Sequence, residues 1–271
     1  MDALPEAAPW AAVITAAGSS ARMTADGQAG IKKEYRPLPG RFDGTGRPLT
    51  VLGAAVFAFA ACAGIETIVI TVPPDAQSGE AAARRALPAG FPDAGGPELL
   101  FVPGGKTRRA SVHEALSLLT ARRPLYVLIH DGARPWVEPS LIRAVMAAAC
   151  RYQAALPLLP LVETPKEIAA GDLPDGALPG RGAGPVFVKR HLRRSAVGTA
   201  QTPQGFAFPE ILYAHQKAAA REGAENFDYT DDAEVWGEFC GPVAVVPGSP
   251  ENRKITFPED LAAGEPGRAA E

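Results

Sequence analysis

The sequence predicts an α/β domain built on a doubly wound, mostly parallel sheet, and three observations carry this prediction. Short apolar runs that fit buried strands alternate with segments whose apolar residues recur at helical spacing. Small or polar residues follow directly on several of these runs, as expected where parallel strands end in loops. The chain has 271 residues, which is enough for one such domain with a sizeable core.

The first part of the chain gives two strands and one helix. Residues 13–15 are a short apolar run before a loop of small residues. Thr50 is a suitable N-cap for a helix that begins at Val51. The apolar run from 51 to 65 is too short to span a bilayer, which needs about 20 residues. Residues 65–72 predict a buried strand that ends at Pro73.

The alternation continues to residue 149. Residues 99–102 predict a third strand, and residues 125–129 predict another that ends at His130 and Asp131. Two helices are predicted from apolar residues that share one face: Val112, Ala115, Leu116 and Leu119 in the first, and Leu141, Ile142, Val145, Met146 and Ala149 in the second. In such a fold, helices cover both faces of the sheet and ligands bind beyond the carboxyl ends of the strands.

We expect one domain over residues 10–262 that is interrupted by a projecting arm over about residues 156–200. Within the arm, residues 171–185 are rich in Gly, Pro and Ala, which predicts a mobile loop. Arms of this kind often reach a neighbouring subunit, so a homodimer is expected. Residues 263–271 are expected to form a disordered tail.

Composition argues against some binding partners and against secretion. The formal net charge of −3 argues against bulk binding to nucleic acid or to an anionic membrane. The N-terminus is acidic and lacks the basic region of a secretory signal. Cys62, Cys150 and Cys240 are far apart and form no Cys-x-x-Cys motif, which predicts reduced thiols. We therefore expect a cytoplasmic protein.

The loop after the first strand is a candidate phosphate-binding segment. Residues 16–23 read Ala-Ala-Gly-Ser-Ser-Ala-Arg-Met. Small residues let backbone N–H groups approach a phosphate closely, and Arg22 could hold the phosphate with its fork of donors. An ordinary strand-to-helix turn with a surface arginine is the alternative. The G-x-G-x-x-G pattern is absent, which argues against a dinucleotide-binding dehydrogenase.

A second candidate segment begins at Gly104 and Gly105. It lacks the first glycine of a Walker motif, because residue 100 is Leu. Arg108 and Arg109 then stand at a helix start, where positive charge is unfavourable by about 0.3–1 kcal/mol. A bound anion would offset that cost, and two solvated arginines are the alternative.

Carboxylates supply a candidate metal site. Asp131 stands at the carboxyl end of its strand, where it could hold Mg²⁺ against nucleotide phosphates. Asp231 and Asp232 form a second acidic group, for which a helix N-cap is the alternative. The basic segments 32–35 and 252–256 are also explained by a solvated surface. The four His residues show no ligand spacing, and we assign them no metal.

The chain contains seven short segments in this order: AAGSSARM, KKEY, GGKTRRASV, HDGARP, TPQGF, TDDAEV and NRKITFPEDL. Together they resemble the 2-C-methylerythritol 4-phosphate cytidylyltransferase family of isoprenoid synthesis. The resemblance runs from about residue 13 to residue 261. Each motif is weak alone, but the ordered set is specific. It implies a Rossmann-like nucleotidyltransferase fold and an enzyme that uses Mg²⁺. It also implies transfer of CMP from CTP to a sugar-alcohol phosphate, 2-C-methyl-D-erythritol 4-phosphate, with release of pyrophosphate.

The resemblance also implies roles for single residues. Arg22 and Lys33 match residues that stabilise the α-phosphate as it is attacked. Asp131 matches the metal-binding aspartate, and Asp231 matches a second aspartate near metal and substrate. The expected nucleotide contacts are Ala16, Ala17, Gly18, Gly104, Gly105, Arg108 and Ser111.

The acceptor side of the implied site includes residues of the arm. Lys254 and Arg194 match residues that hold the acceptor phosphate as nucleophile. Thr164 and Arg194 lie on the arm, which in the family embraces a second subunit, so each site would be completed by its neighbour. The full set of expected substrate contacts is Thr164, Arg134, Arg194, Lys254 and Asp231.

The sequence also departs from the family pattern. Residues 24–32, 39–48 and 171–185 are longer than usual, and Lys106 stands where the family often has an acidic residue. No second catalytic domain follows residue 261, so the form without a fused cyclase is expected. Two alternatives stay open: a ribitol 5-phosphate cytidylyltransferase, and a non-catalytic nucleotide-binding regulator on the same scaffold.

Overall fold

The computed structural model describes residues 8–18, 31–43, 45–88, 90–92, 95–168, 186–225 and 228–262. Four sequence predictions concern segments outside these ranges. They are the role of Arg22, most of the insertion at 24–32, the loop at 171–185 and the tail at 263–271.

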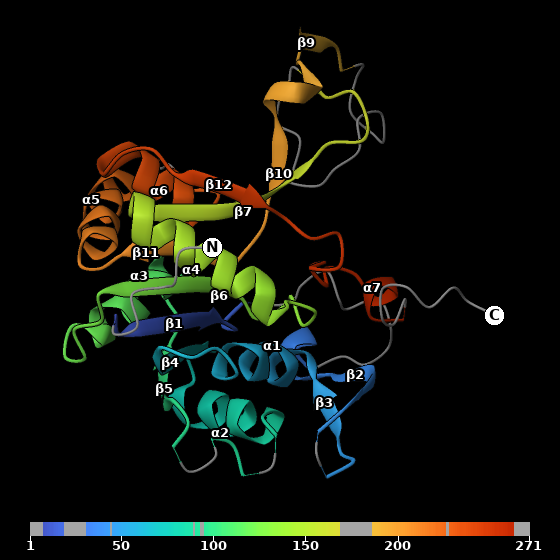
Figure 1. Ribbon diagram of the computed structural model, residues 1–271, viewed down its shortest axis with the longest axis vertical. Helices are drawn as coiled ribbons and strands as arrows, with labels where there is room; N and C mark the ends of the chain where they lie inside the picture. Colours follow the sequence, from blue (N-terminus) through green and yellow to red (C-terminus); the bar gives the residue numbers. More distant parts are fainter. Residues whose placement is uncertain are drawn as a thin grey trace.

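An eight-stranded sheet forms the centre of the molecule (Figure 1). Its order is β10-β7-β11-β6-β1-β4-β5, and β12 also pairs with β7. The strands are β1 (Trp10–Thr15), β4 (Ile65–Val72), β5 (Glu98–Pro103), β6 (Tyr126–Asp131), β7 (Ala154–Pro160), β10 (Gly198–Ala200), β11 (Gln204–Ala207) and β12 (Ala244–Pro247). β6, β1, β4 and β5 run parallel, whereas β11 is antiparallel to both β6 and β7. The prediction of a mostly parallel sheet is confirmed.

Helices cover both faces of this sheet, as predicted. One core cluster joins the sheet to α1 (Val51–Ala60), α2 (Ala76–Ala86) and α4 (Pro139–Tyr152). The other joins it to α3 (Arg108–Leu119), α5 (Glu210–Glu225) and α6 (Asp232–Phe239). The apolar faces expected for α3 and α4 are buried in full. Thr50 caps α1, because its hydroxyl accepts a hydrogen bond of 2.9 Å from the Gly53 N–H.

The register of the central strands aligns three polar residues at one edge of the sheet. Thr15 at the end of β1 pairs with Thr71 of β4 on one side and with Asp131 of β6 on the other. Parallel strands share their carboxyl edge, so the loops that follow β1, β4 and β6 all leave from the same place. β6 ends at His130 and Asp131, where the sequence predicted its end, and both residues are buried.

A small hairpin and a short C-terminal helix flank this edge. A 3-10 helix, η2 (Lys33–Tyr35), leads into strands β2 (Pro37–Phe42) and β3 (Pro48–Thr50), which pair antiparallel. This hairpin contains most of the 39–48 insertion, for which the sequence predicted no structure. Helix α7 (Pro258–Ala262) contacts β2. Both elements lie on the same side of the sheet (Figure 1).

The arm projects from the carboxyl end of β7 and the amino end of β10 (Figure 1). Its strands β8 (Lys166–Ile168) and β9 (Val188–His191) pair antiparallel, and η3 (Arg194–Ala196) follows. Residues 156–160 and 198–200 pair within the main sheet, so the arm leaves the sheet only after Pro160 and returns to it at Gly198.

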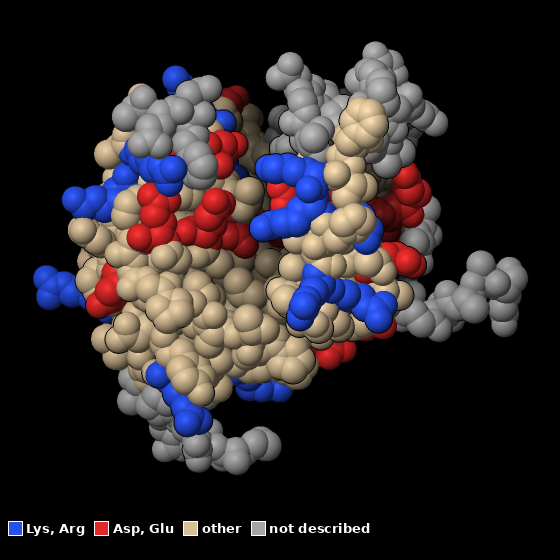
Figure 2. Space-filling view, turned by 90° about the horizontal axis from the view of Figure 1, so that it is seen from above, with Lys and Arg blue, Asp and Glu red and all other residues tan. Residues whose placement is uncertain are grey.

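Charged side chains are mixed on the face seen in Figure 2, where basic and acidic groups stand next to each other around an extended uncharged area. In the part of the chain described above, no helix has both the length and the apolar character needed to cross a membrane.

Candidate active site

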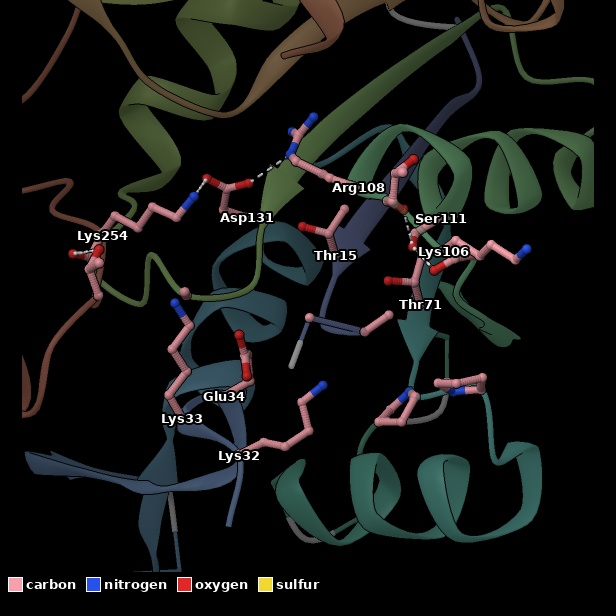
Figure 3. A pocket seen from close by; sticks show the side chains of 18 residues that line it. Thr15, Lys32, Lys33, Glu34, Thr71, Lys106, Arg108, Ser111, Asp131 and Lys254 are labelled. Atoms are coloured by element: carbon pink, nitrogen blue, oxygen red, sulfur yellow. Dashed lines mark hydrogen bonds and ion pairs between the residues drawn. The ribbon is translucent and has the colours of Figure 1, made fainter. Parts of the chain in front are cut away.

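A cavity of about 730 Å³ opens at the carboxyl edge of β1, β4 and β6. It lies where ligands bind in open α/β sheets. Side chains from widely separated parts of the chain point into it (Figure 3). Its lining includes Thr15, Ala17, Gly18, Lys32, Lys33, Glu34, Thr71, Gly105, Lys106, Thr107, Arg108, Ser111, Asp131 and Lys254.

Asp131 is the centre of the charged network in this cavity. Its Oδ2 lies 2.9 Å from Lys254 Nζ and 3.5 Å from Arg134 Nε, and its Oδ1 lies 3.4 Å from Arg108 Nε. Burial alone would raise the pKa of Asp131, but Lys254, Arg108 and Arg134 outweigh it and hold that pKa far below its usual range. The carboxylate is therefore ionised at neutral pH.

Arg108 shows how the fold offsets positive charge at the start of α3. Its Nη2 lies 2.8 Å from Oδ2 of the buried Asp232, in addition to its contact with Asp131. Burial opposes the charged form of Arg108, but Asp232 and Asp131 outweigh burial and raise its pKa. Protein carboxylates thus supply the anion that the sequence led us to expect. The second arginine, Arg109, is buried and pairs with Glu222 of α5 at 2.6 Å.

His130 and Thr202 fix the backbone that carries Asp131. The Asp131 N–H donates to Thr202 Oγ1 at 3.1 Å, and that hydroxyl lies 3.0 Å from His130 Nδ1. His130 Nε2 lies 3.2 Å from the Arg134 carbonyl, which can only accept. The proton of the neutral ring therefore belongs on Nε2, and Nδ1 accepts from Thr202. The hydrogen bonds of His130 therefore give it a structural role.

Burial of His130 leads to a prediction about stability and pH. Burial lowers the pKa of His130 to about 4, below the ordinary value of 6.5. Between these values the unfolded chain binds the proton more readily than the folded chain. The contribution of His130 to the free energy of unfolding is therefore fully present above pH 6.5 and falls as the pH drops toward 4. The free energy of unfolding is expected to fall by about 3 kcal/mol in total.

Urea unfolding at pH 4.5, 5.5, 6.5 and 7.5 tests this prediction. The free energy of unfolding of His130→Gln should depend less on pH than that of the wild type over this range. Equal slopes for the two proteins would show that His130 does not carry the effect.

Two glycines let the loop after β1, the loop after β5 and the start of α3 pack closely together. A Cβ added at Gly104 would lie 2.3 Å from Ala17 Cβ and 2.9 Å from Ser111 Oγ. One added at Gly105 would lie 2.6 Å from Ala110 Cβ. Side chains at these positions would separate the loop after β1 from the start of α3, which explains the glycine pair.

The C-terminal segment brings Lys254 to the cavity. The Ile255 N–H donates to the Ala133 carbonyl at 2.8 Å, and Asn252 Nδ2 donates to the Thr202 carbonyl at 2.7 Å. Lys33 Nζ donates to the Ile255 carbonyl at 2.7 Å. The segments predicted to be basic patches are thus joined to each other across the edge of the sheet.

Most of the predicted site residues meet in this cavity. The predicted residues that line it are Ala17, Gly18, Lys33, Gly105, Arg108, Ser111, Asp131 and Lys254. Ala16, Gly104 and Arg134 support it from behind: the Ala16 N–H bonds to Thr71, the Gly104 N–H bonds to the Val72 carbonyl, and Arg134 contacts Asp131. The lining also includes Thr15, Thr71 and Lys32, which were not predicted from the sequence as site residues. The clue for Thr15 and Thr71 was their place at the ends of predicted strands.

Asp231 has a different place from the one predicted. Its Oδ1 accepts from the Glu234 N–H at 2.8 Å and so caps α6, and its Oδ2 accepts from Gln204 Nε2 at 2.8 Å. It does not line the cavity. The helix-cap alternative therefore describes this carboxylate, and its neighbour Asp232 is the one that contacts Arg108. The metal and substrate roles of Asp231 stay predictions that this geometry does not favour.

The two arm residues lie outside the cavity of their own chain. Thr164 and Arg194 are exposed, and Arg194 Nη1 donates to the Val162 carbonyl at 2.6 Å. Neither residue lines the cavity, so any role they have in a site depends on a second subunit.

Comparison with known proteins identifies the family. The family model for 2-C-methyl-D-erythritol 4-phosphate cytidylyltransferase, IspD, matches residues 10–266. The chain belongs to this family. Members of this cytidylyltransferase family are nucleotidyltransferases. The match agrees with the resemblance inferred from the seven motifs.

Individual relatives agree with this assignment. The bifunctional enzyme IspD/IspF of Bradyrhizobium sp. (strain ORS 278) is 36% identical over 266 residues, which cover 96% of this chain and 56% of that protein. The 2-C-methyl-D-erythritol 4-phosphate cytidylyltransferase of Thermus thermophilus is 29% identical, with a TM-score of 0.62 over 93% of this chain and 96% of that one. The 4-diphosphocytidyl-2C-methyl-D-erythritol synthase of Anaerococcus prevotii shares the fold, with 24% identity and a TM-score of 0.69 over 94% of each chain. The chain spans little more than half the length of the curated relatives it matches.

The charged residues of the cavity are of a kind that could hold a divalent metal together with the phosphates of a ligand. Among the described residues, no three Asp, Glu, His or Cys side chains gather closely enough to hold a metal by themselves. Mg²⁺ commonly binds through one or two carboxylates together with substrate phosphates and water. The ionised Asp131 supplies one such carboxylate. Its present partners, Lys254 and Arg108, are cations suited to phosphate oxygens.

Proposed function

We propose that the chain transfers CMP from CTP to 2-C-methyl-D-erythritol 4-phosphate, giving 4-diphosphocytidyl-2-C-methyl-D-erythritol and pyrophosphate. The observation that carries the proposal is the convergence of Lys33, Asp131 and Lys254 on one cavity beside a loop of small residues. These residues lie in three of the seven family motifs, more than 200 positions apart at the extremes.

The chemistry is a displacement at the α-phosphorus of CTP. An oxygen of the acceptor phosphate forms the new bond to phosphorus, the bond to the bridging oxygen breaks, and pyrophosphate leaves with that electron pair. The acceptor phosphate is already ionised, so no general base is required. Catalysis of this kind depends on positioning and on stabilising negative charge.

The residues of the cavity can divide these tasks among them. Backbone N–H groups of Ala17 and Gly18 approach the phosphates, and Ser111 together with Gly105 lines the part suited to the base. Lys33 stabilises charge on the α-phosphate, and Lys254 orients the acceptor phosphate. Asp131 would hold Mg²⁺, which when bound neutralises charge on the triphosphate and helps to align it.

The homodimer belongs to the same proposal. Thr164 and Arg194 are exposed on a projecting arm and lie outside the cavity of their own chain. A second subunit would bring them to the acceptor side of its neighbour's cavity. The three unpaired cysteines fit a reducing compartment, and we place the reaction in the cytoplasm.

Mixing two inactive variants tests the shared site. Asp131→Asn lacks the metal ligand and Arg194→Ala lacks the arm contact, so each homodimer should have little activity. In a mixed dimer one site combines the intact Asp131 with the partner's intact Arg194, and activity should return to about a quarter of the wild-type value per dimer in an equimolar statistical mixture. Activity no higher than that of the separate variants would show that each subunit works alone.

Pyrophosphate release is the experiment that tests the proposed activity. The wild-type chain is incubated with Mg²⁺ and CTP, and then with either 2-C-methyl-D-erythritol 4-phosphate or ribitol 5-phosphate. Rapid release with the first acceptor alone supports the proposal. Preference for ribitol 5-phosphate would identify the alternative enzyme, and CTP binding without release would identify a regulator.

A further inference from the structure

Lys32, next to the lysine of the family motif, has an unusual place in the cavity. Its Nζ donates to the Ala16 carbonyl at 2.8 Å, at the point where β1 leads into the loop of small residues. Its ammonium also lies 5.9 Å from the centre of the Tyr35 ring. Both partners are neutral, and within the described residues no carboxylate comes within ion-pair distance of Lys32.

Three other cations at the cavity are held differently. Lys254 and Arg108 each contact the Asp131 carboxylate, and Lys33 donates to the Ile255 carbonyl on the C-terminal segment. Lys32 is half-buried, and burial lowers its pKa while the nearby Glu34 opposes that shift. A partly desolvated ammonium that lacks a paired carboxylate favours an anionic ligand at this place.

The direction of Lys32 indicates which part of a triphosphate it would contact. Figure 3 shows Lys33 extending toward the side of Lys254, whereas Lys32 enters the cavity on the side away from Lys254. In a displacement at phosphorus the attacking and leaving oxygens lie roughly in line on opposite sides. If Lys254 marks the side of the attacking phosphate, Lys32 marks the side of the leaving group.

We propose that Lys32 is a further catalytic residue, which binds the β- and γ-phosphates of CTP and stabilises the departing pyrophosphate. As the bond between the α-phosphorus and the bridging oxygen breaks, that oxygen gains the electron pair, and the Lys32 ammonium donates a hydrogen bond to the pyrophosphate. No proton needs to be transferred. This inference rests on the proposed function. It assigns a role to Lys32, which precedes Lys33, the lysine that matches the family motif.

Three substitutions separate the charge of Lys32 from its hydrogen bond to Ala16. Lys32→Ala removes both, Lys32→Gln keeps a neutral hydrogen-bond donor without the charge, and Lys32→Arg keeps the charge. Lys217→Ala removes an exposed lysine on α5 and is the matched control. Binding of CTP, CMP and inorganic pyrophosphate is measured by calorimetry with Mg²⁺, and turnover is measured by pyrophosphate release.

The expected pattern follows from the loss of a charge-assisted hydrogen bond. Ala and Gln variants should bind CTP and pyrophosphate about tenfold more weakly, while CMP affinity changes less than about twofold. Their kcat should fall on the order of 10²-fold, and the Arg variant should retain most activity. Wild-type behaviour of the Gln variant would show that Lys32 only tethers the loop, and equal loss of CMP binding would also overturn the proposal. If the wild type itself releases no pyrophosphate, the proposed function fails instead.

Discussion

Replacing Asp131 with asparagine is expected to lower kcat on the order of 10³-fold, the largest effect among the cavity residues. Two losses combine in this variant. The cavity loses the carboxylate that would hold Mg²⁺, and Lys254, Arg108 and Arg134 lose their common anionic partner. Asparagine keeps the size of the side chain, so packing at the end of β6 should change little.

The same substitution should also lower stability, because it removes a counter-charge from the partly buried Arg108 and Arg134. Arg108 keeps its contact with Asp232, but Arg134 has no second carboxylate in the contacts described above. We expect the free energy of unfolding to fall by about 3 kcal/mol at pH 7. Asp75→Asn, a change at an exposed residue before α2, is the control. If Asp131→Asn kept turnover within tenfold of the wild type at saturating Mg²⁺, the metal role would be wrong.

Replacing Lys254 with alanine is expected to impair use of the acceptor far more than use of CTP. Lys254 stands at the rim of the cavity, with 39% of its side chain exposed, and reaches Asp131 at 2.9 Å. If it holds the attacking phosphate, kcat/KM for the acceptor should fall on the order of 10²-fold. The Kd of CTP should stay within about twofold, because the interaction is made with the other substrate.

Lys254→Arg provides the matched comparison for this prediction. It keeps the charge and should recover part of the loss in kcat/KM. Steady-state kinetics with each substrate varied in turn, together with calorimetry of CTP, separate the two effects. An equal loss of acceptor use and CTP affinity would place Lys254 on the nucleotide instead.

The parallel core of the fold could be predicted because its signals are local. The apolar runs that became β4 and β5 and the helical spacing of α3 and α4 are each contained in a few residues. The cap at Thr50 was predictable for the same reason. The meeting of Thr15 and Asp131 at one edge follows from strand order, since parallel neighbours end at the same level.

Other features depend on contacts that no local pattern contains. Nothing in residues 204–207, Gln-Gly-Phe-Ala, indicates that β11 runs antiparallel between β6 and β7. Arg108 pairs with Asp232, which lies 124 positions away, and the N-cap signal at Asp231 and Asp232 did not show which of the two carboxylates would contact Arg108. The family motifs placed Lys254 in the site, but its position depends on backbone contacts between Ile255 and Ala133.

A crystal structure of the chain soaked with CTP and MgCl₂ tests the central claim most directly. Our account predicts the triphosphate in the cavity at the carboxyl edge of β1, β4 and β6, with a magnesium ion between it and Asp131 and the base beside Gly104 and Ser111. Lys254 should then have turned from Asp131 toward the side from which an acceptor would attack. Nucleotide bound elsewhere, or a metal held without Asp131, would contradict it.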